Sequence, residues 1–238
     1  MPANKILDTF AQAVVDIPDG AVILLDGFGS QGGMPSYLIE ALRDHGARDL
    51  TLIGNTAGLG GFGARPGESF IDPGILFENR QVRKVIASFP VARSPSNPTP
   101  FEKAYRRGEV ELEVVPQGTL AERIRAGGAG LGGFYTPTDV GTLVEKGKEK
   151  KTINGREYIL ELPLKGDFAL IRAHKADRMG NLVYQGTSRN FNAVMAPAAR
   201  ITVVEVDEIV EVGDLDPEAI VTPGIFVHRI VQRKGNSL

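Results

Sequence analysis

The chain has 238 residues, 42% of them hydrophobic, and its 27 basic and 29 acidic side chains give a net charge of −2. A chain of this size can bury a full core, and we predict a single domain over residues 1–238. With a net charge this close to zero, the chain lacks the overall positive charge that would attract nucleic acid or an anionic membrane surface. We therefore expect small ligands and protein partners.

Cysteine is missing from the sequence, which excludes a thiol nucleophile, a disulfide bond and a thiolate metal ligand. The three histidines, His45, His174 and His228, lie far apart without a second ligand at helical spacing, so we predict no metal site. The first residues lack a basic stretch followed by an apolar core, and no apolar run approaches the roughly 18 residues of a membrane span. These features predict a soluble, cytoplasmic protein that does not engage a membrane.

The first half of the chain alternates short apolar runs with helical ones, which is the pattern of a parallel sheet with helices on its faces. We predict strands at residues 21–25, 50–55, 82–89 and 110–115. Between and after them we predict helices at 36–45, near 73–80, near 100–107, and from about 120 to the glycines at 127 and 128.

The second half is richer in strands. We predict them at 157–162, 168–174, 182–184, 201–206 and 225–231, with a helix around 190–199. Because strands there follow one another with few helices between them, a mixed sheet is favoured over a purely parallel one. The predicted fold class is α/β, with an open, largely parallel or mixed sheet and helices on both faces.

Two segments rich in glycine or proline, 59–67 and 90–100, directly follow predicted strands. Segments in that position are either solvent loops or lids that face a ligand. A short run of mixed charge, 145–151, predicts a solvated hairpin rather than a binding site.

A glycine-rich segment, Gly27-Phe28-Gly29-Ser30-Gln31-Gly32-Gly33, follows the first predicted strand and precedes a helix. Ligands of open α/β proteins bind at this end of a strand. The glycine spacing matches the dinucleotide fingerprint, but the second strand ends in Gly54-Asn55-Thr56 and lacks the acidic residue that binds the ribose. The segment also lacks the Gly-Lys-Ser/Thr of a P-loop. The sequence therefore disfavours both nucleotide sites.

A second glycine-rich stretch runs from Pro116-Gln117-Gly118 to Gly130-Leu131-Gly132-Gly133-Phe134. Together with the first, it resembles the A subunit of the family I 3-oxoacid CoA-transferases, and the resemblance extends from Ile17-Pro18-Asp19-Gly20 to Val227-His228-Arg229. The stretch 215–227 and Ser88-Phe89-Pro90 resemble the 3-oxoadipate branch most.

The resemblance implies an enzyme of the EC 2.8.3 class that moves CoA from an acyl-CoA, typically succinyl-CoA, to a 3-oxo acid such as 3-oxoadipate or acetoacetate. It implies a partner B subunit in a heterodimer or heterotetramer. A glutamate of that partner attacks the thioester and forms a glutamyl-CoA intermediate. This chain has no motif that matches the nucleophile. The resemblance implies no cofactor, since the CoA thioester is a substrate.

By matching motif, Asn55 and Gln117 correspond to family amides near the nucleophile, where an amide can donate to a developing oxyanion. In the ordinary structural role, Asn55 serves a turn and Gln117 caps a backbone group. The expected substrate- and CoA-binding residues are the glycine-rich positions Gly27, Phe28, Gly29, Gly32, Gly33, Gly127 and Gly128.

The chain departs from the family pattern in two places. Asp26 stands where the family usually has glycine, and Thr56 stands where it has a second asparagine. These differences concern the choice of substrate more than the class of reaction. Two other functions stay open: an acyl-CoA hydrolase on the same frame, and a ligand-binding module without enzymatic activity.

Overall fold

The computed structural model describes residues 4–25, 28, 33–58, 71–92 and 96–233. The strands are β1 (Ile6–Leu7), β2 (Val22–Leu25), β3 (Leu50–Thr56), β4 (Val82–Phe89), β5 (Glu111–Val114), β6 (Phe134–Thr136), β7 (Lys150–Ile153), β8 (Arg156–Glu161), β9 (Gly166–Asp177), β10 (Leu182–Val183), β11 (Ala199–Val210) and β12 (Arg229–Gln232). The α-helices are α1 (Phe10–Val14), α2 (Ser36–His45), α3 (Gly74–Glu78), α4 (Pro100–Arg106), α5 (Gln117–Ala129) and α6 (Asn192–Met195).

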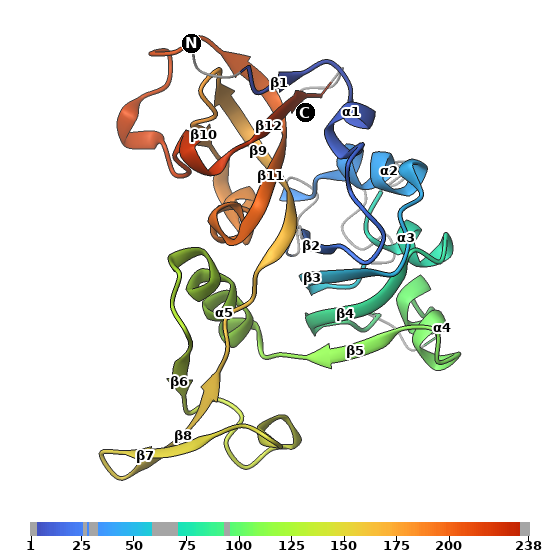
Figure 1. Ribbon diagram of the computed structural model, residues 1–238, viewed down its shortest axis with the longest axis vertical. Helices are drawn as coiled ribbons and strands as arrows, with labels where there is room; N and C mark the ends of the chain where they lie inside the picture. Colours follow the sequence, from blue (N-terminus) through green and yellow to red (C-terminus); the bar gives the residue numbers. More distant parts are fainter. Residues whose placement is uncertain (1–3, 26–27, 29–32, 59–70, 93–95, 234–238) are drawn as a thin grey trace.

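The main sheet has nine strands, eight of them in the order β1-β12-β11-β9-β2-β3-β4-β5 (Figure 1). Every neighbouring pair in that order is parallel, whereas β10 pairs antiparallel with β9. The prediction of an open, largely parallel or mixed sheet is confirmed. The order of the strands reverses at the pair β9 and β2, because β3, β4 and β5 lie on one side of it and β11 and β12 on the other.

Two hydrophobic cores lie on opposite faces of this sheet. Helices α1, α2, α3 and α4 cover one face and contribute buried side chains to the first core. Helices α5 and α6 cover the other face and contribute to the second core. Since side chains alternate between faces along a strand, Leu52 of β3 packs in the first core and Ile53 in the second. The prediction of helices on both faces is confirmed.

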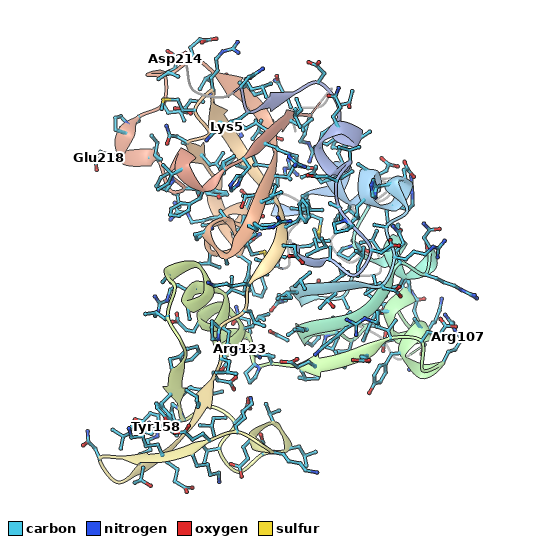
Figure 2. All side chains as sticks on the ribbon, viewed as in Figure 1. Lys5, Arg107, Arg123, Tyr158, Asp214 and Glu218 are labelled. Carbon is cyan, nitrogen blue, oxygen red and sulfur yellow. The ribbon has the colours of Figure 1, made fainter. Side chains whose placement is uncertain are left out.

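A smaller sheet projects from this body. Strands β6, β8 and β7 pair antiparallel in that order and form an arm beyond α5 (Figure 1). Figure 2 places Tyr158 on the arm and Arg123 at its base, where α5 meets it. The sequence predicts a strand at 157–162 and a charged hairpin before it, but not that these residues form a sheet of their own.

Most predicted elements of the first half coincide with observed ones, and the prediction for 36–45 has the bounds of α2. The predicted strand 225–231 is wrong in its first half, where residues 224–226 form a 3₁₀ turn and the strand begins only at Arg229. The predicted helix 190–199 is too long. It spans Asn192–Met195 and continues as a 3₁₀ turn, because Pro197 has no N–H to extend the α-helix.

The expected lid at 59–67 lies outside the described residues, as do positions 93–95 of the second one. Next to the latter gap, the backbone N–H of Ala92 donates to Glu102 Oε2 over 3.0 Å. This bond attaches the chain that leaves β4 to the first turn of α4. Among the described residues, no helix is long and apolar enough to cross a membrane.

Candidate active site at the carboxyl edge of the sheet

The strand order of the main sheet reverses between β2 and β9. In open α/β sheets, ligands bind outside the strands at such a point. Leu25 at the end of β2 is paired in register with Leu170, in the first half of β9, so β9 continues well beyond β2. The glycine-rich segment predicted to bind substrate leaves β2 at this point.

Two described members of that segment, Phe28 and Gly33, contact the turn before α6. The rings of Phe28 and Phe191 lie 6.0 Å apart, and the Phe28 side chain is 42% exposed. Asn192, which is fully buried, donates from Nδ2 to the carbonyl oxygen of Gly33 over 3.0 Å. Its Oδ1 accepts the N–H of Arg172 in β9. Asn192 therefore ties the glycine-rich segment to the neighbouring strand. Asp26, Gly27, Gly29 and Gly32 lie outside the described residues.

Asn55 is the penultimate residue of β3 and is only 5% exposed. It lies two residues after Ile53, which packs in the same core as Leu120 of α5, so Asn55 is on the face that α5 covers. The register of β3 and β4 places it opposite Ser88. The hydroxyl oxygens of Ser88 and of Thr56 are buried without a hydrogen bond to any described residue.

Gln117 is the first residue of α5 and is exposed. Pro116 precedes it, and the helix begins with the bond from Leu120 N–H to the Pro116 carbonyl over 2.8 Å. Because α5 follows β5 and packs against β3 and β4, its amino end lies at the carboxyl edge, on the same face as Asn55. The fold thus brings both predicted amides to one edge and one face of the sheet.

Gly127 and Gly128 lie at the other end of α5, about 15 Å from Gln117 at 1.5 Å per residue. A Cβ at Gly127 would meet the carbonyl oxygen of Leu164 at 2.0 Å, and one at Gly128 would meet Pro197 at 3.0 Å. Close packing therefore accounts for both glycines. The structure does not bring them to the edge that holds Asn55 and Gln117.

The amino terminus of α2 is occupied by a carboxylate of the chain itself. Glu205 of β11 is fully buried and accepts the N–H groups of Tyr37 and Leu38 over 2.9 and 3.1 Å. Arg233 donates to its other oxygen over 2.7 Å and lies 4.6 Å from the centre of the Tyr37 ring. Burial raises the pKa of Glu205 to about 7, against the opposing effect of Arg233. A dinucleotide phosphate would need those same helical N–H groups.

Further charged groups surround Glu205 on the face of the sheet that α2 covers. Asp207 of β11 pairs with Arg172 over 3.0 Å and with Arg233 over 3.5 Å, and its other oxygen lies 3.3 Å from His174 Nδ1. Arg233 is thus shared between the carboxylates of Glu205 and Asp207, and Arg172 pairs with Asp207. The sequence does not predict this network, because its members lie on separate segments of the chain and meet only in the fold.

The other two histidines make backbone contacts at separate places, His45 with the carbonyl of Val15 and His228 with the N–H of Thr202. Among the described residues, no group of three His, Cys, Asp or Glu side chains could hold a metal ion. What the edge offers chemically is a set of amide and hydroxyl groups that donate hydrogen bonds without titrating. Such groups suit the binding of carboxylate and thioester oxygens.

The sequence is similar to those of known coenzyme A transferases. Residues 7–233 match the family model described as coenzyme A transferase. The chain is 51% identical over 232 residues to the A subunit of 3-oxoadipate CoA-transferase from Pseudomonas putida, covering 98% of this chain and 95% of that one. It is 48% identical over 227 residues to the alpha subunit of acetate CoA-transferase from Escherichia coli K12, covering 94% and 96%.

Solved structures share the fold. An acyl-CoA transferase from E. coli O157:H7, solved as a thioester complex with CoA, superposes with a TM-score of 0.77 at 19% identity over 98% of this chain. This chain spans only 50% of the length of that one. Glutaconate CoA-transferase from Acidaminococcus fermentans gives a TM-score of 0.77 at 21% identity and covers 96% of this chain and 75% of that one. With the matched family model and the identities above, this chain belongs to the coenzyme A transferases and is an A-type subunit of the family I enzymes.

Proposed function

We propose that this chain is one half of a two-chain CoA-transferase and that a B subunit completes its active site. The family I glutamate of the partner attacks the thioester carbonyl of an acyl-CoA, giving an acyl-glutamyl anhydride and the CoA thiolate. The thiolate then attacks the glutamyl carbonyl, which releases the free acid and leaves glutamyl-CoA. The acceptor acid reverses both steps with its own carboxylate, and the new acyl-CoA departs.

The role of this chain is to hold the oxygens on which charge develops. Each attack converts a carbonyl oxygen to an oxyanion, and a neutral amide can donate a hydrogen bond to it without losing a proton. Asn55 and Gln117 are the two amides in position to do so. The observation that carries this proposal is their shared placement, at one edge and on one face of the sheet, although 61 intervening residues separate them in sequence.

For the substrates we propose succinyl-CoA as donor and 3-oxoadipate as acceptor. The support is the 51% identity to the A subunit of a 3-oxoadipate CoA-transferase, together with the segment 215–227 and Ser88-Phe89-Pro90. A second relative, the A subunit of the probable succinyl-CoA:3-ketoacid transferase of Bacillus subtilis, is 47% identical over 96% of this chain. Acetoacetate is therefore the first alternative acceptor.

The test is to express the chain together with the B-type chain from the same genome, purify the complex and supply succinyl-CoA. Formation of new acyl-CoA is followed with 3-oxoadipate, acetoacetate and acetate in turn. We expect transfer that requires both chains and an acceptor, with the highest kcat/KM for 3-oxoadipate. Loss of acyl-CoA without any acceptor would instead identify a hydrolase, and full activity of this chain alone would contradict the division of the site between two subunits.

A further inference from the structure

Asn190 has a backbone conformation that asparagine rarely adopts. It follows the 3₁₀ turn at Gly186–Arg189, and its φ of 25° with ψ of −127° belongs to a region that favours glycine. Conformations of this kind cost on the order of 1–3 kcal/mol and occur most often at functional sites. The strain at Asn190 is therefore a reason to ask what its side chain does.

The side chain of Asn190 is held in one orientation. Its Oδ1 accepts the backbone N–H of Asn192 over 3.2 Å and the Nδ2 of Asn192 over 3.1 Å. Because a backbone N–H can only donate, this pair of bonds fixes which end of the amide is oxygen. The NH₂ end must point the other way.

That NH₂ group is buried and has no hydrogen-bond acceptor among the described residues. A buried donor left without an acceptor costs about 1–3 kcal/mol. It lies against the glycine-rich segment, so closely that a Cβ at Gly33 would be 2.0 Å from it. The group therefore lies against the segment that follows β2, with two N–H bonds available for an acceptor.

We propose that Asn190 donates a hydrogen bond to a ligand oxygen, either the carboxylate of the acid or the carbonyl of the thioester. Gly33 contacts the NH₂ group with backbone alone, so the ligand oxygen approaches that group from beside Gly33 and not between the two residues. Asn190 thus adds a third amide to Asn55 and Gln117. This inference rests on the proposed function, because the acyl and carboxylate groups are the ligands of that reaction.

The test replaces Asn190 in the complex with its B subunit. Asn190→Gly removes the amide and also relieves the strained backbone, so we expect an unchanged or higher Tm together with a fall in kcat/KM for the acceptor acid of about tenfold or more. Asn190→Asp keeps the shape, replaces the donor with an anionic oxygen and should lower kcat/KM further. Asn154→Gly is the matched control, since Asn154 also has a positive φ, 50°, but lies exposed in the turn between β7 and β8.

We expect the Asn154→Gly complex to keep the kcat/KM of the unsubstituted complex. Unchanged kcat/KM in Asn190→Gly would overturn the inference and leave the proposed function intact. A lower Tm in Asn190→Gly, matched by its loss of activity, would also overturn it, because Asn190 would then support the fold only. An unsubstituted complex without CoA transfer would overturn the proposed function itself, and this inference with it.

Discussion

Gln117 is exposed at the start of α5, at the carboxyl edge of the sheet. If this amide donates to an oxyanion, its removal raises the barrier of the chemical step rather than weakening the fold. We expect Gln117→Ala to lower kcat of the assembled enzyme by tens-fold or more, with little change in assembly. The measurement is steady-state transfer from succinyl-CoA, together with the elution volume of the complex.

The control for Gln117 is Arg106→Ala. Arg106 is also an exposed residue of a helix, α4, but lies outside the proposed site. Its substitution should leave kcat unchanged. An equal kcat for Gln117→Ala and the unsubstituted enzyme would return Gln117 to an ordinary role at the helix start.

Glu205 makes stability depend on pH. Its carboxyl group has a pKa of about 7 in the folded chain and an ordinary value of 4.5, because burial disfavours the charge. Between these two values the folded state holds a proton that the unfolded state has lost. The free energy of unfolding therefore falls as pH rises from 4.5 to 7, by up to roughly 3 kcal/mol from this one group.

The Glu205→Gln variant isolates that contribution, since glutamine does not titrate. We expect the stability of the unsubstituted chain relative to the variant to be higher at pH 5 than at pH 8, measured by urea unfolding at both values. Glu218→Gln serves as the control, because it makes the same substitution at an exposed glutamate. A Glu205→Gln difference that is equal at pH 5 and pH 8 would mean that Glu205 is ionised throughout.

At the scale of elements, α5 runs from the candidate active site to the arm, and its glycines differ in how closely they are packed. A Cβ at Gly127 would collide with the Leu164 carbonyl, whereas one at Gly118 would meet open space. We expect Gly127→Ala to destabilise the chain by about 1–3 kcal/mol, since backbone cannot move aside cheaply. Gly118→Ala should instead stabilise it by about 0.5–1 kcal/mol, because alanine favours the helix.

Urea unfolding of the two glycine variants decides between packing and ligand binding as the reason for Gly127. If Gly127→Ala proves as stable as the unsubstituted chain, close packing does not require glycine there. A role for Gly127 in substrate binding, which the sequence suggests, would then gain support from any loss of activity in the same variant.

Elements with a strong pattern were predictable from the sequence. Strand β2 is a continuous apolar run, β3 and β4 hold shorter apolar runs between polar residues, and α2 carries Leu38, Ile39 and Leu42 on one stripe before a glycine in the left-handed conformation. Short elements were not, because β1 and α1 have two and five residues and depend on pairing with β12 and on a capping box at Thr9. Local pattern is too weak over such lengths.

The site divides in the same way. Asn55 and Gln117 could be found because they lie in motifs at the ends of predicted strands. The stretches Ser188-Arg189-Asn190-Phe191-Asn192 and Val203-Val204-Glu205-Val206 resemble the same family, but the sequence gives neither Asn190 nor Glu205 a role, because what distinguishes these two side chains is three-dimensional. Glu205 meets the start of α2 from more than 160 residues away, and Asn190 is distinguished by its backbone angles and by the position of Gly33.

At the scale of the whole molecule, the arm of β6, β7 and β8 is attached to the body through buried charges. Arg123 of α5 donates to the Leu162 carbonyl over 2.8 Å and pairs with Glu113 of β5 over 2.9 Å. Its Nε also lies 3.7 Å from Glu161, which is 2% exposed and pairs with Lys148 over 2.5 Å. These contacts link α5, the main sheet and the arm in one network, and Figure 2 places its central residue, Arg123, at the base of the arm.

Removing the central cation should loosen the arm. Arg123→Met retains most of the side-chain volume but leaves Glu161 buried with Lys148 as its one remaining described cation, and Glu113 with Lys84. Removal of one partner from a buried ion pair typically costs about 3 kcal/mol or more. We expect the free energy of unfolding, measured in urea, to fall by about that amount. Relative to the unsubstituted chain, amide hydrogen exchange should quicken more in β7 and β8 than in β3 and β4.

Arg125→Met is the matched control on the same helix. Arg125 lies two residues further along, is exposed and pairs only with Glu122 among the described residues, so its loss should change stability by no more than about 0.5 kcal/mol. If Arg123→Met behaves like Arg125→Met, the arm is held by backbone pairing and not by the charges at its base. If exchange quickens in the arm alone, the network holds the arm in place on the body of the subunit.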